Sequence, residues 1–430
     1  MNGFAATGDA DFIKRINKHK ILTVLRPNER RARIDIAEAA GLSPATVSAL
    51  TQELLDEGVL VELDADRRDF VRPDGRHSGR PRGRPRVLLG PNPDAAIVAG
   101  TKISMHQVAV SITNFVGDVL TSKTHPVNVE HEPPEIVADL IERLLYMSAD
   151  DIGCSISGLS GLGVGIPGFI DHVAGVCHWS PVFGAKAIPF AAMLRDRLGI
   201  PVLVDNDANL VTLAEQWFGH GHGVSDFVVV TVEHGVGMGA VIGGELYRGH
   251  RGFGSELGHT KIDRNGALCR CGQRGCLEAY VADYALVRDA RTVFRLPAGD
   301  DPSTVREAIG SLTALARAGD DNAAALFAAA GEALGIGVAN AVNILNPPLL
   351  ILSGAGMESY DLMEDAFLRA LKANALSVEQ HTMPVAVGSS DDTVWARGAA
   401  ALVLQALYEP PITRPITGDF CVIGKGPLTR

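Results

Sequence analysis

The sequence has few cysteines and few aromatic residues, and no long run of apolar residues. Six cysteines in 430 residues are too sparse for a disulfide framework, and three of them stand close together at Cys269, Cys271 and Cys276. No stretch approaches the roughly 20 apolar residues that a bilayer-spanning helix needs. The first residues show no basic segment followed by an apolar run, which argues against a signal peptide. We therefore expect a cytoplasmic protein with no membrane partner.

The content of apolar residues is 46% and that of charged residues is 21%, which is ordinary for a globular protein of two or three domains. The net charge of −11 is unevenly distributed. Residues 1–90 contain 16 basic and 13 acidic side chains, whereas the rest of the chain is strongly acidic. An acidic body with one basic end is typical of a chain that contacts a polyanion through that end.

The first 63 residues predict a winged helix-turn-helix. Apolar residues recur at helical spacing over about 10–26, and a second, short helix ends at Gly41. Ser43 is a good N-cap for a third helix, and the alternating segment 59–63 indicates a strand. In DNA-binding proteins this third helix enters the major groove; the alternative is a three-helix protein-interaction module. The candidate DNA-contacting residues on its exposed face are Ser43, Ala45, Thr46, Ser48 and Gln52.

An arginine-rich stretch follows at 67–86, with eight arginines against two aspartates. Within it, the run Gly-Arg-Pro-Arg-Gly-Arg-Pro-Arg resembles an AT-hook. Proline keeps such a chain extended, and the guanidinium groups of Arg80, Arg82 and Arg84 would lie along a narrow minor groove. The alternatives are contact with the DNA backbone alone and a solvated linker.

From about residue 93 the chain alternates strands and helices, and the pattern occurs twice, each time with a glycine-rich loop after a buried strand. This predicts an α/β body of two lobes with a site between them. The predicted divisions are 1–75 for the winged helix-turn-helix, 76–92 for the AT-hook-like linker, 93–210 for the first lobe, 211–408 for the second lobe, whose last helix returns to the first, and 409–430 for a tail.

The strongest chemical signal is a His-x9-Cys-x-Cys-x4-Cys pattern. One imidazole and three thiolates form a closed tetrahedral set for Zn²⁺, with no position left for water, which indicates a structural metal. Glycines inside the pattern allow the sharp turns that such convergence needs. The alternative is three free thiols in a loop. The predicted ligands are His259, Cys269, Cys271 and Cys276.

These motifs resemble the signature of the ROK family, which comprises sugar kinases and sugar-responsive transcription regulators. The resemblance rests on Gly254–His259, on the cysteine cluster and on the segment Gly275–Glu278. It extends over most of the chain, including the helix-turn-helix that only the regulator branch carries. It implies an actin/hexokinase-like (ribonuclease H-like) body, the same four zinc ligands, and a homodimer or a dimer of dimers on a pseudo-palindromic operator.

The resemblance also implies a sugar site. Carboxylates, an amide and an imidazole can satisfy a ring of hydroxyls in fixed directions, and His259 would use one ring nitrogen for zinc and the other for the sugar. The residues that match the family's sugar-binding positions are Gly168, Asn206, Asp207, Glu256, His259 and Glu278.

In the family's kinases the residue that matches Asp207 is the catalytic base, and a first phosphate loop positions the nucleotide. Here Lys102 stands roughly where that loop should have an acidic residue, and Ser104 and His106 replace its glycine and threonine. The second phosphate loop is preceded by Glu233, which would repel a triphosphate. We therefore expect a degenerate kinase without activity.

Together these features predict a DNA-binding transcriptional regulator, a repressor, that senses a sugar or a sugar phosphate. One alternative is an ATP-dependent, glucokinase-like sugar kinase fused to a DNA-binding domain. The other is a chromatin-like binder in which the arginine-rich segment dominates. The sequence leaves open which sugar acts as effector.

Overall fold

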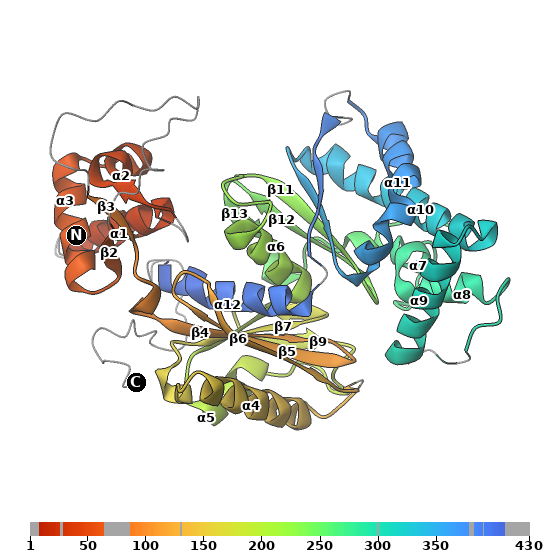
Figure 1. Cartoon of the computed structure of the whole chain (residues 1–430), viewed down its shortest axis with the longest axis horizontal. Helices are drawn as coiled ribbons and strands as arrows, with labels where there is room; N and C mark the ends of the chain where they lie inside the picture. The colour runs from red at the N-terminus through yellow and green to blue at the C-terminus, as the bar shows by residue number, and fades with distance from the viewer. Residues whose placement is uncertain are drawn as a thin grey trace, which may run out of the picture.

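The computed structural model describes residues 8–25, 29–63, 87–129, 131–297, 299, 301–377, 382–389 and 391–408. They form a small N-terminal domain and two α/β lobes (Figure 1). The arginine-rich segment with Arg80, Arg82 and Arg84, and the predicted tail at 409–430, lie outside the described residues.

The N-terminal domain is a winged helix. The structure ends one helix at Gly41, in the left-handed conformation with φ 63°, and caps the next through Ser43 Oγ, which accepts a hydrogen bond from the Thr46 amide at 3.1 Å. The strands form one antiparallel sheet in the order β1-β3-β2. Its elements are α1 (Gly8–Val24), β1 (Arg31–Ala32), α2 (Arg33–Ala40), α3 (Pro44–Asp56), β2 (Leu60–Leu63) and β3 (Leu88–Pro91).

The position of β3 differs from the sequence-based division, which assigned 76–92 to a linker. Leu89 on β3 is fully buried in the core that α1 and α3 form with Leu50 and Leu60. The last strand of the wing therefore lies after the arginine-rich segment. Sequence alone gave no sign of this, because pairing between β2 and β3 joins residues separated by that whole segment.

The first lobe contains a mixed sheet in the order β10-β7-β4-β5-β6. Helices α4 and α5 cover one face, and α12 covers the other (Figure 1). A separate hairpin is formed by β8 (Phe169–Asp171) and β9 (Val176–Trp179). The remaining elements are β4 (Ile97–Ile103), β5 (Gln107–Asn114), β6 (Val119–Pro126), α4 (Pro134–Asp151), β7 (Leu162–Ile166), α5 (Phe190–Leu198), β10 (Val202–Asn206) and α12 (Asp392–Tyr408).

The second lobe contains a sheet in the order β13-β12-β11-β14-β15. Helix α6 packs on one face and α10 on the other, where it contacts α11 along its length. The elements are α6 (Asp207–Phe218), β11 (Phe227–Val232), β12 (Val236–Ile242), β13 (Glu245–Tyr247), α7 (Glu278–Val281), α8 (Asp283–Ala290), α9 (Pro302–Arg317), α10 (Asp321–Leu345), β14 (Leu350–Ser353), α11 (Tyr360–Asn374) and β15 (Val385–Val387).

Helix α10 corrects one sequence-based expectation. By length and composition it is the one helix among the described residues that is apolar enough to span a bilayer, although the sequence analysis found no such stretch. Of its most apolar window, 61% is buried inside the protein. Gly331 and Gly335 pack against α11, and the buried alanines of the helix belong to the core of the second lobe, so its apolar character is explained by burial there.

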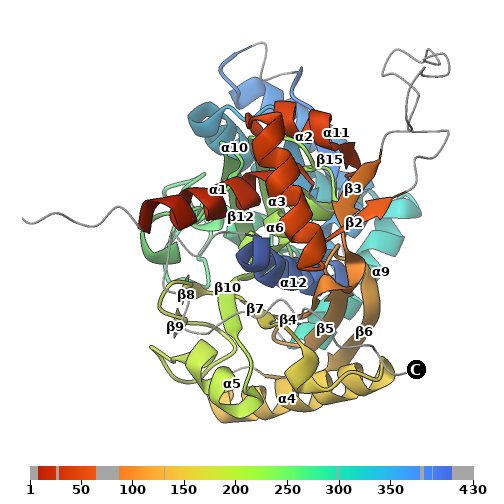
Figure 2. The same ribbon diagram turned by 90° about the vertical axis from the view of Figure 1, so that its left-hand side faces the viewer.

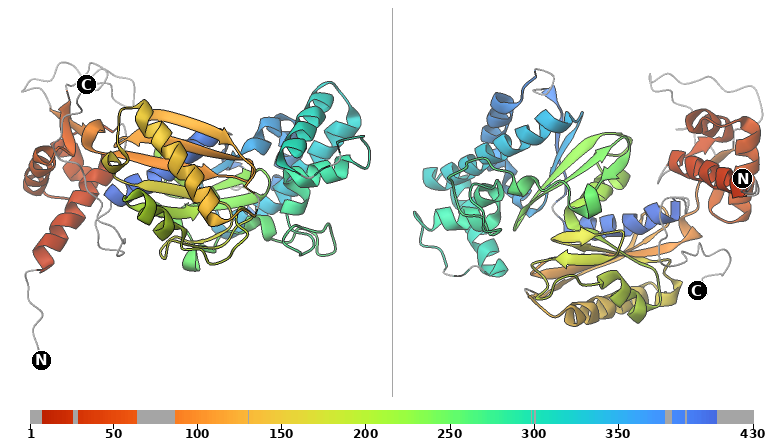
Figure 3. Two further views of the ribbon diagram at one scale, coloured as in Figure 1. Left: turned by 90° about the horizontal axis from the view of Figure 1, so that it is seen from below. Right: turned by 180° about the vertical axis from the view of Figure 1, so that it is seen from behind.

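The final helix, α12, connects all three parts. It lies with α6 between the two sheets and ends beside the winged helix (Figures 2 and 3). The strands beneath it contact it so closely that a Cβ at Gly100 would come within 2.0 Å of the Ala396 carbonyl oxygen, and one at Gly163 within 1.9 Å of that of Ala399. Only glycine fits at these two positions.

Candidate functional site

The end of β10 brings two predicted sugar-site segments into contact. Asn206 caps α6 through Oδ1, which accepts from the Ala208 amide at 2.9 Å, and its Nδ2 donates to the Gly168 carbonyl oxygen at 3.0 Å. Gly168 has φ 118°, and a Cβ there would lie 2.2 Å from the Trp179 carbonyl oxygen. The glycine is therefore required by its backbone position, and its carbonyl orients the asparagine amide.

Three carboxyl groups gather next to this contact. Burial raises the pKa of Asp207 to about 6; Lys102 opposes the rise and Glu233 adds to it. Glu256 as a whole residue is exposed, but the surrounding protein removes water from its carboxyl group. This desolvation, together with the neighbouring carboxylates of Asp207 and Glu278, raises the pKa of Glu256 to about 7. A carboxyl whose pKa lies close to neutral pH, as that of Glu256 does, donates a hydrogen bond when protonated and accepts when ionised, which suits hydroxyl ligands.

Glu278 links the carboxyl groups to the histidine–cysteine cluster. Its Oε1 lies 3.4 Å from Cys269 Sγ, which in turn lies 3.8 Å from His259 Nδ1. The predicted residues Gly168, Asn206, Asp207, Glu256, His259 and Glu278 thus form one connected neighbourhood.

The four predicted metal ligands converge. Their donor atoms, from His259, Cys269, Cys271 and Cys276, all lie within 4.8 Å of one another. The two sulfurs of Cys271 and Cys276 are 3.7 Å apart, close to the ~3.8 Å edge of a tetrahedron with Zn–S bonds of about 2.3 Å. The geometry of the cluster could therefore hold a metal ion with tetrahedral coordination.

Sequence reasoning missed a cation beside this cluster. Lys261 Nζ donates to Cys276 Sγ at 2.8 Å, and this hydrogen bond raises the pKa of Lys261. A lysine on an exposed loop looks like ordinary surface charge in a sequence. Only the antiparallel bridge between Lys261 and Cys276 reveals that its ammonium group lies against a sulfur of the cluster.

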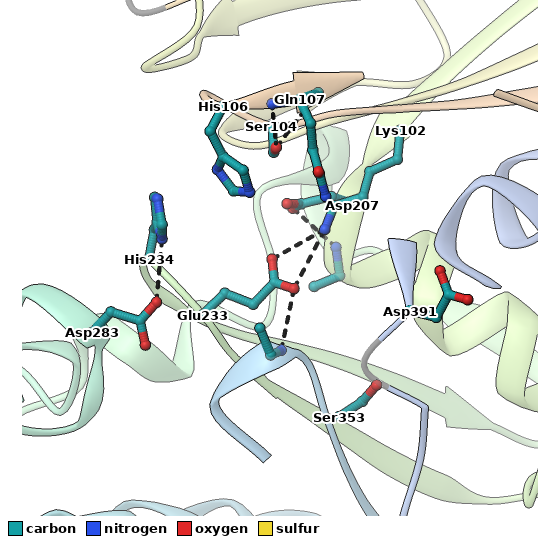
Figure 4. A network of polar contacts seen from close by, with 12 residues as sticks. Lys102, Ser104, His106, Gln107, Asp207, Glu233, His234, Asp283, Ser353 and Asp391 are labelled. Carbon is teal, nitrogen blue, oxygen red and sulfur yellow. Dashed lines mark hydrogen bonds and ion pairs between the residues drawn. The ribbon is translucent and has the colours of Figure 1, made fainter. Parts of the chain in front are cut away.

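The two segments assigned to altered phosphate loops meet between the lobes (Figure 4). Lys102 Nζ, on β4, lies 3.1 Å and 3.4 Å from the two carboxylate oxygens of Glu233, at the end of β11. Close by, His106 from the first lobe lies 4.9 Å, ring centre to ring centre, from His234 of the second. His234 contacts Asp283 at 3.3 Å, and burial, with nearby positive charges, lowers the pKa of His106 to about 3.

Further ion pairs between the lobes were also absent from the sequence analysis. Arg248 Nε donates to Asp205 Oδ2 at 2.7 Å, and Asp205 is fully buried. Arg251, in the same loop, contacts Asp171 at 3.3 Å. The partners lie 43 and 80 residues apart in the chain, so no local pattern could have paired them.

On the winged helix, the predicted DNA-contacting residues lie along one side of α3. Ser43, Ala45, Ser48 and Gln52 are exposed and Thr46 is half-buried. Elsewhere on the helix Glu53 pairs with Lys14 at 2.9 Å and with Lys18 at 3.2 Å, both on α1. Helix α1 therefore fixes α3 by ion pairs as well as by apolar packing, and leaves the candidate face open.

Two family models match the chain. The model described as the ROK family covers residues 98–406, and the one described as winged helix-turn-helix DNA-binding covers residues 14–61. Together they account for both the N-terminal domain and the two-lobed body.

Several proteins are similar to the chain over nearly its whole length. A putative xylose repressor of Caldicellulosiruptor sp. (strain Rt8B.4) is 30% identical over 408 residues, which are 94% of this chain and 99% of that protein. The DNA-binding transcriptional dual regulator NagC of Escherichia coli (strain K12) is 25% identical over 411 residues, 94% of this chain and 96% of that protein.

Solved structures agree on the fold. A ROK family transcriptional regulator, a homolog of the E. coli MLC protein, superposes with a TM-score of 0.75 and 24% identity over 92% of this chain and 97% of that one. A ROK family glucokinase from Streptomyces griseus, in complex with glucose and AMPPNP, gives a TM-score of 0.61 and 25% identity over 72% of this chain and 99% of that one.

Proposed function

This chain belongs to the ROK family, and from that premise we propose that it is a sugar-responsive, DNA-binding transcriptional repressor. The observation that carries the proposal is the combination of a winged helix with an exposed α3 face and a two-lobed body whose polar residues converge between strand ends. The similarity to a putative xylose repressor and to the transcriptional dual regulator NagC extends over 94% of the chain, so it includes both parts.

In this proposal the sugar or sugar phosphate binds at Gly168, Asn206, Asp207, Glu256, His259 and Glu278. The raised pKa of Asp207 and Glu256 supports that assignment, because two partly protonated carboxyls offer both donors and acceptors to a ring of hydroxyls. The effector would favour one of two arrangements of the lobes, and a coupling of about 1–3 kcal/mol would change operator occupancy about 5- to 150-fold.

We further propose that His259, Cys269, Cys271 and Cys276 hold Zn²⁺. When bound, the ion would supply structural cross-linking of a loop that has little secondary structure of its own. His259 Nδ1 faces Cys269, which leaves Nε2 for a hydroxyl of the effector. The metal thus would orient a sensing side chain and take no part in a reaction.

A second candidate function is ATP-dependent sugar phosphorylation, favoured by the similarity to a glucokinase structure with glucose and AMPPNP. In that reaction Asp207 would be the base. The ion pair between Lys102 and Glu233 argues against this function, because it lies at the segments expected to hold phosphates. An assay of ADP release with hexoses and amino sugars separates the two functions. Turnover of about 1 s⁻¹ or more would establish a kinase.

For DNA, the proposal places Ser43, Ala45, Thr46, Ser48 and Gln52 in the major groove and the arginine-rich segment on the minor groove or the backbone. Two copies in a homodimer, or four in a dimer of dimers, would read a pseudo-palindrome. Such a regulator acts on chromosomal DNA in the cytoplasm.

The decisive experiment measures operator binding with and without ligand. Fluorescence anisotropy on promoter fragments from the chain's own genomic neighbourhood gives the affinity, and a thermal-shift panel of sugars and sugar phosphates identifies the effector. We expect one ligand class to raise the melting temperature and to change operator affinity at least fivefold. The proposal is wrong if no saccharide changes either quantity.

A further inference from the structure

The ion pair between Lys102 and Glu233 joins the two lobes from within. Lys102 belongs to β4 of the first lobe and is only 3% exposed; Glu233 follows β11 of the second lobe and is 20% exposed. Figure 4 shows both side chains extended toward each other across the space between the lobes, beside Asp207. Because both charged groups are largely removed from water, the opposite charge of each partner compensates for the hydration that the other has lost.

Each partner has a second contact in its own surroundings. Lys102 Nζ lies 3.5 Å from the centre of the Trp395 ring, in the first turn of α12. Glu233 Oε1 accepts from the Ala355 amide at 3.4 Å, at the glycine turn that follows β14. A Cβ at Gly354 would lie 3.0 Å from Glu233 Cγ, so the glutamate packs directly against that turn.

This arrangement resembles the way in which a protein holds a bound anion. An amide at a glycine turn on one lobe and an ammonium on the other are groups that commonly hold a phosphate, and here a carboxylate of the chain itself accepts from both. We propose that Glu233 is a built-in anion that takes the place of a nucleotide phosphate and, through Lys102, holds the lobes together without any nucleotide. Lys102, Glu233 and Trp395 are then positioning residues, because they act on the geometry of the lobes.

Helix α12 extends this link to the winged helix. Trp395 is in its first turn, and the glycine contacts along β4 and β7 pack the helix directly against the first lobe. Its last residue, Tyr408, accepts a hydrogen bond from His19 of α1 through its backbone oxygen. A continuous series of contacts therefore runs from Glu233 of the second lobe to the DNA-binding domain, as coupling between lobe position and DNA binding requires.

The Lys102–Glu233 pair acts together with other contacts between the lobes. Asp205–Arg248 and Asp171–Arg251 also join them, and Arg306 contacts His106. Loss of one pair should therefore shift the distribution of lobe distances without separating the lobes completely. The Lys102–Glu233 pair differs from the others in that its cation lies against α12.

Chemical rescue tests the proposal. In Glu233→Ala the anion is removed and Lys102 is left without it, so added inorganic phosphate should occupy the vacated position. The distance between the lobes is followed by energy transfer between dyes on noncanonical residues at Tyr146 on α4 and Ile344 on α10, which are 52% and 80% exposed. We expect a longer and broader distance in Glu233→Ala, and a return to the parent value with millimolar phosphate but not with sodium chloride of equal ionic strength.

Two controls complete the design. In Lys102→Met/Glu233→Ala both charges of the pair are removed and the cation that would hold phosphate is absent, so the lobe distance should stay long and phosphate should have no effect. In Asp151→Ala an ion pair with Lys123 within the first lobe is lost, and neither distance nor phosphate response should change. The proposal is overturned if the double variant keeps the parent distance, or if phosphate acts equally on Glu233→Ala and on the double variant.

The distance measurement requires neither sugar nor DNA, so it stands apart from the proposed function. The part that concerns α12 rests on that function: Glu233→Ala should change the ratio of operator affinities with and without effector at least threefold, and phosphate should restore it. If the lobe distance changes but the ratio of operator affinities does not, only the part of the proposal that concerns transmission through α12 is overturned.

Discussion

His19 Nδ1 on α1 donates a hydrogen bond to the backbone oxygen of Tyr408, the last residue of α12, at 2.9 Å. The Tyr408 ring stacks on Phe115 with 4.6 Å between ring centres and meets Trp217 edge to face. The apolar core of the winged helix is continuous with that of the body through this region. The DNA-binding domain is therefore docked on the end of a helix that begins between the lobes.

This docking predicts that His19→Ala weakens the coupling between effector and operator. The substitution removes the hydrogen bond to α12 but leaves the effector residues and α3 untouched. We expect the ratio of operator affinities with and without effector to fall at least threefold, with unchanged affinity for the sugar, measured by anisotropy and by calorimetry. Lys20→Ala, exposed on the same helix, is the control. Equal affinity ratios in the parent protein, His19→Ala and Lys20→Ala would contradict the prediction.

The histidine–cysteine cluster predicts one zinc ion per chain. Cys271→Ser removes a ligand that is exposed and makes few other contacts, so the expected losses are the metal itself and more than about 5 °C of melting temperature. Elemental analysis by mass spectrometry gives the metal content. Cys154→Ser, a free cysteine far from the cluster in the fold, should retain the full zinc content. Equal zinc in both variants would exclude the proposed ligand set.

The raised pKa of Asp207 predicts a stability change of definite sign. A carboxyl whose pKa rises to about 6 on folding stabilises the fold fully only below its unfolded pKa of about 4, and this contribution is lost as pH rises through 6. Asp207→Asn stays neutral, so we expect it to raise the melting temperature at pH 8 by about 2–6 °C and to change it little at pH 4.5. The same variant should no longer respond to the sugar.

The control for this pH dependence is Asp196→Asn, whose side chain is 79% exposed. It should leave the melting temperature unchanged at both pH values and preserve the sugar response. If Asp207→Asn were destabilising by the same amount at pH 4.5 and pH 8, burial of its charge would not be the dominant effect.

The exposed face of α3 predicts a specific loss of operator affinity. Gln52→Ala removes an amide that in the free protein donates to Asp56 at 3.0 Å and is free to turn toward a base edge. We expect operator binding to weaken by about 1–3 kcal/mol at one base position, while affinity for random DNA stays the same. Glu38→Ala on α2 is the exposed control. An equal loss of affinity on all DNA sequences would show that Gln52 contacts the DNA backbone and not a base.

The arginine-rich segment predicts how strongly DNA binding depends on salt concentration. Replacing Arg80, Arg82 and Arg84 with alanine should reduce the slope of log K against log salt by up to about 2.7, since each phosphate contact contributes about 0.9. Sequence discrimination should persist. Alanine at three exposed arginines of the lobes, Arg143, Arg295 and Arg369, should leave the slope unchanged. Complete loss of discrimination in the first variant would favour the chromatin-like binder.

The elements that sequence predicted well are those with local causes. The stop at Gly41, the cap at Ser43, and the strand over 59–63 follow from the conformational preferences of a few adjacent residues, and the structure has all three, the strand beginning at Leu60. The histidine–cysteine pattern also converges as predicted, because its short spacing leaves the chain little choice.

What the sequence alone determined, then, is the type of those elements that have local causes, the two-lobed α/β class and the inventory of polar groups. Only the tertiary structure decided that Lys102 pairs with Glu233, that Asp205 pairs with Arg248, and that Leu88–Pro91 completes the wing. These contacts join residues tens to more than a hundred positions apart. Their free energy comes from burying two groups together, and burial is a property of the packed chain that no local run of residues contains.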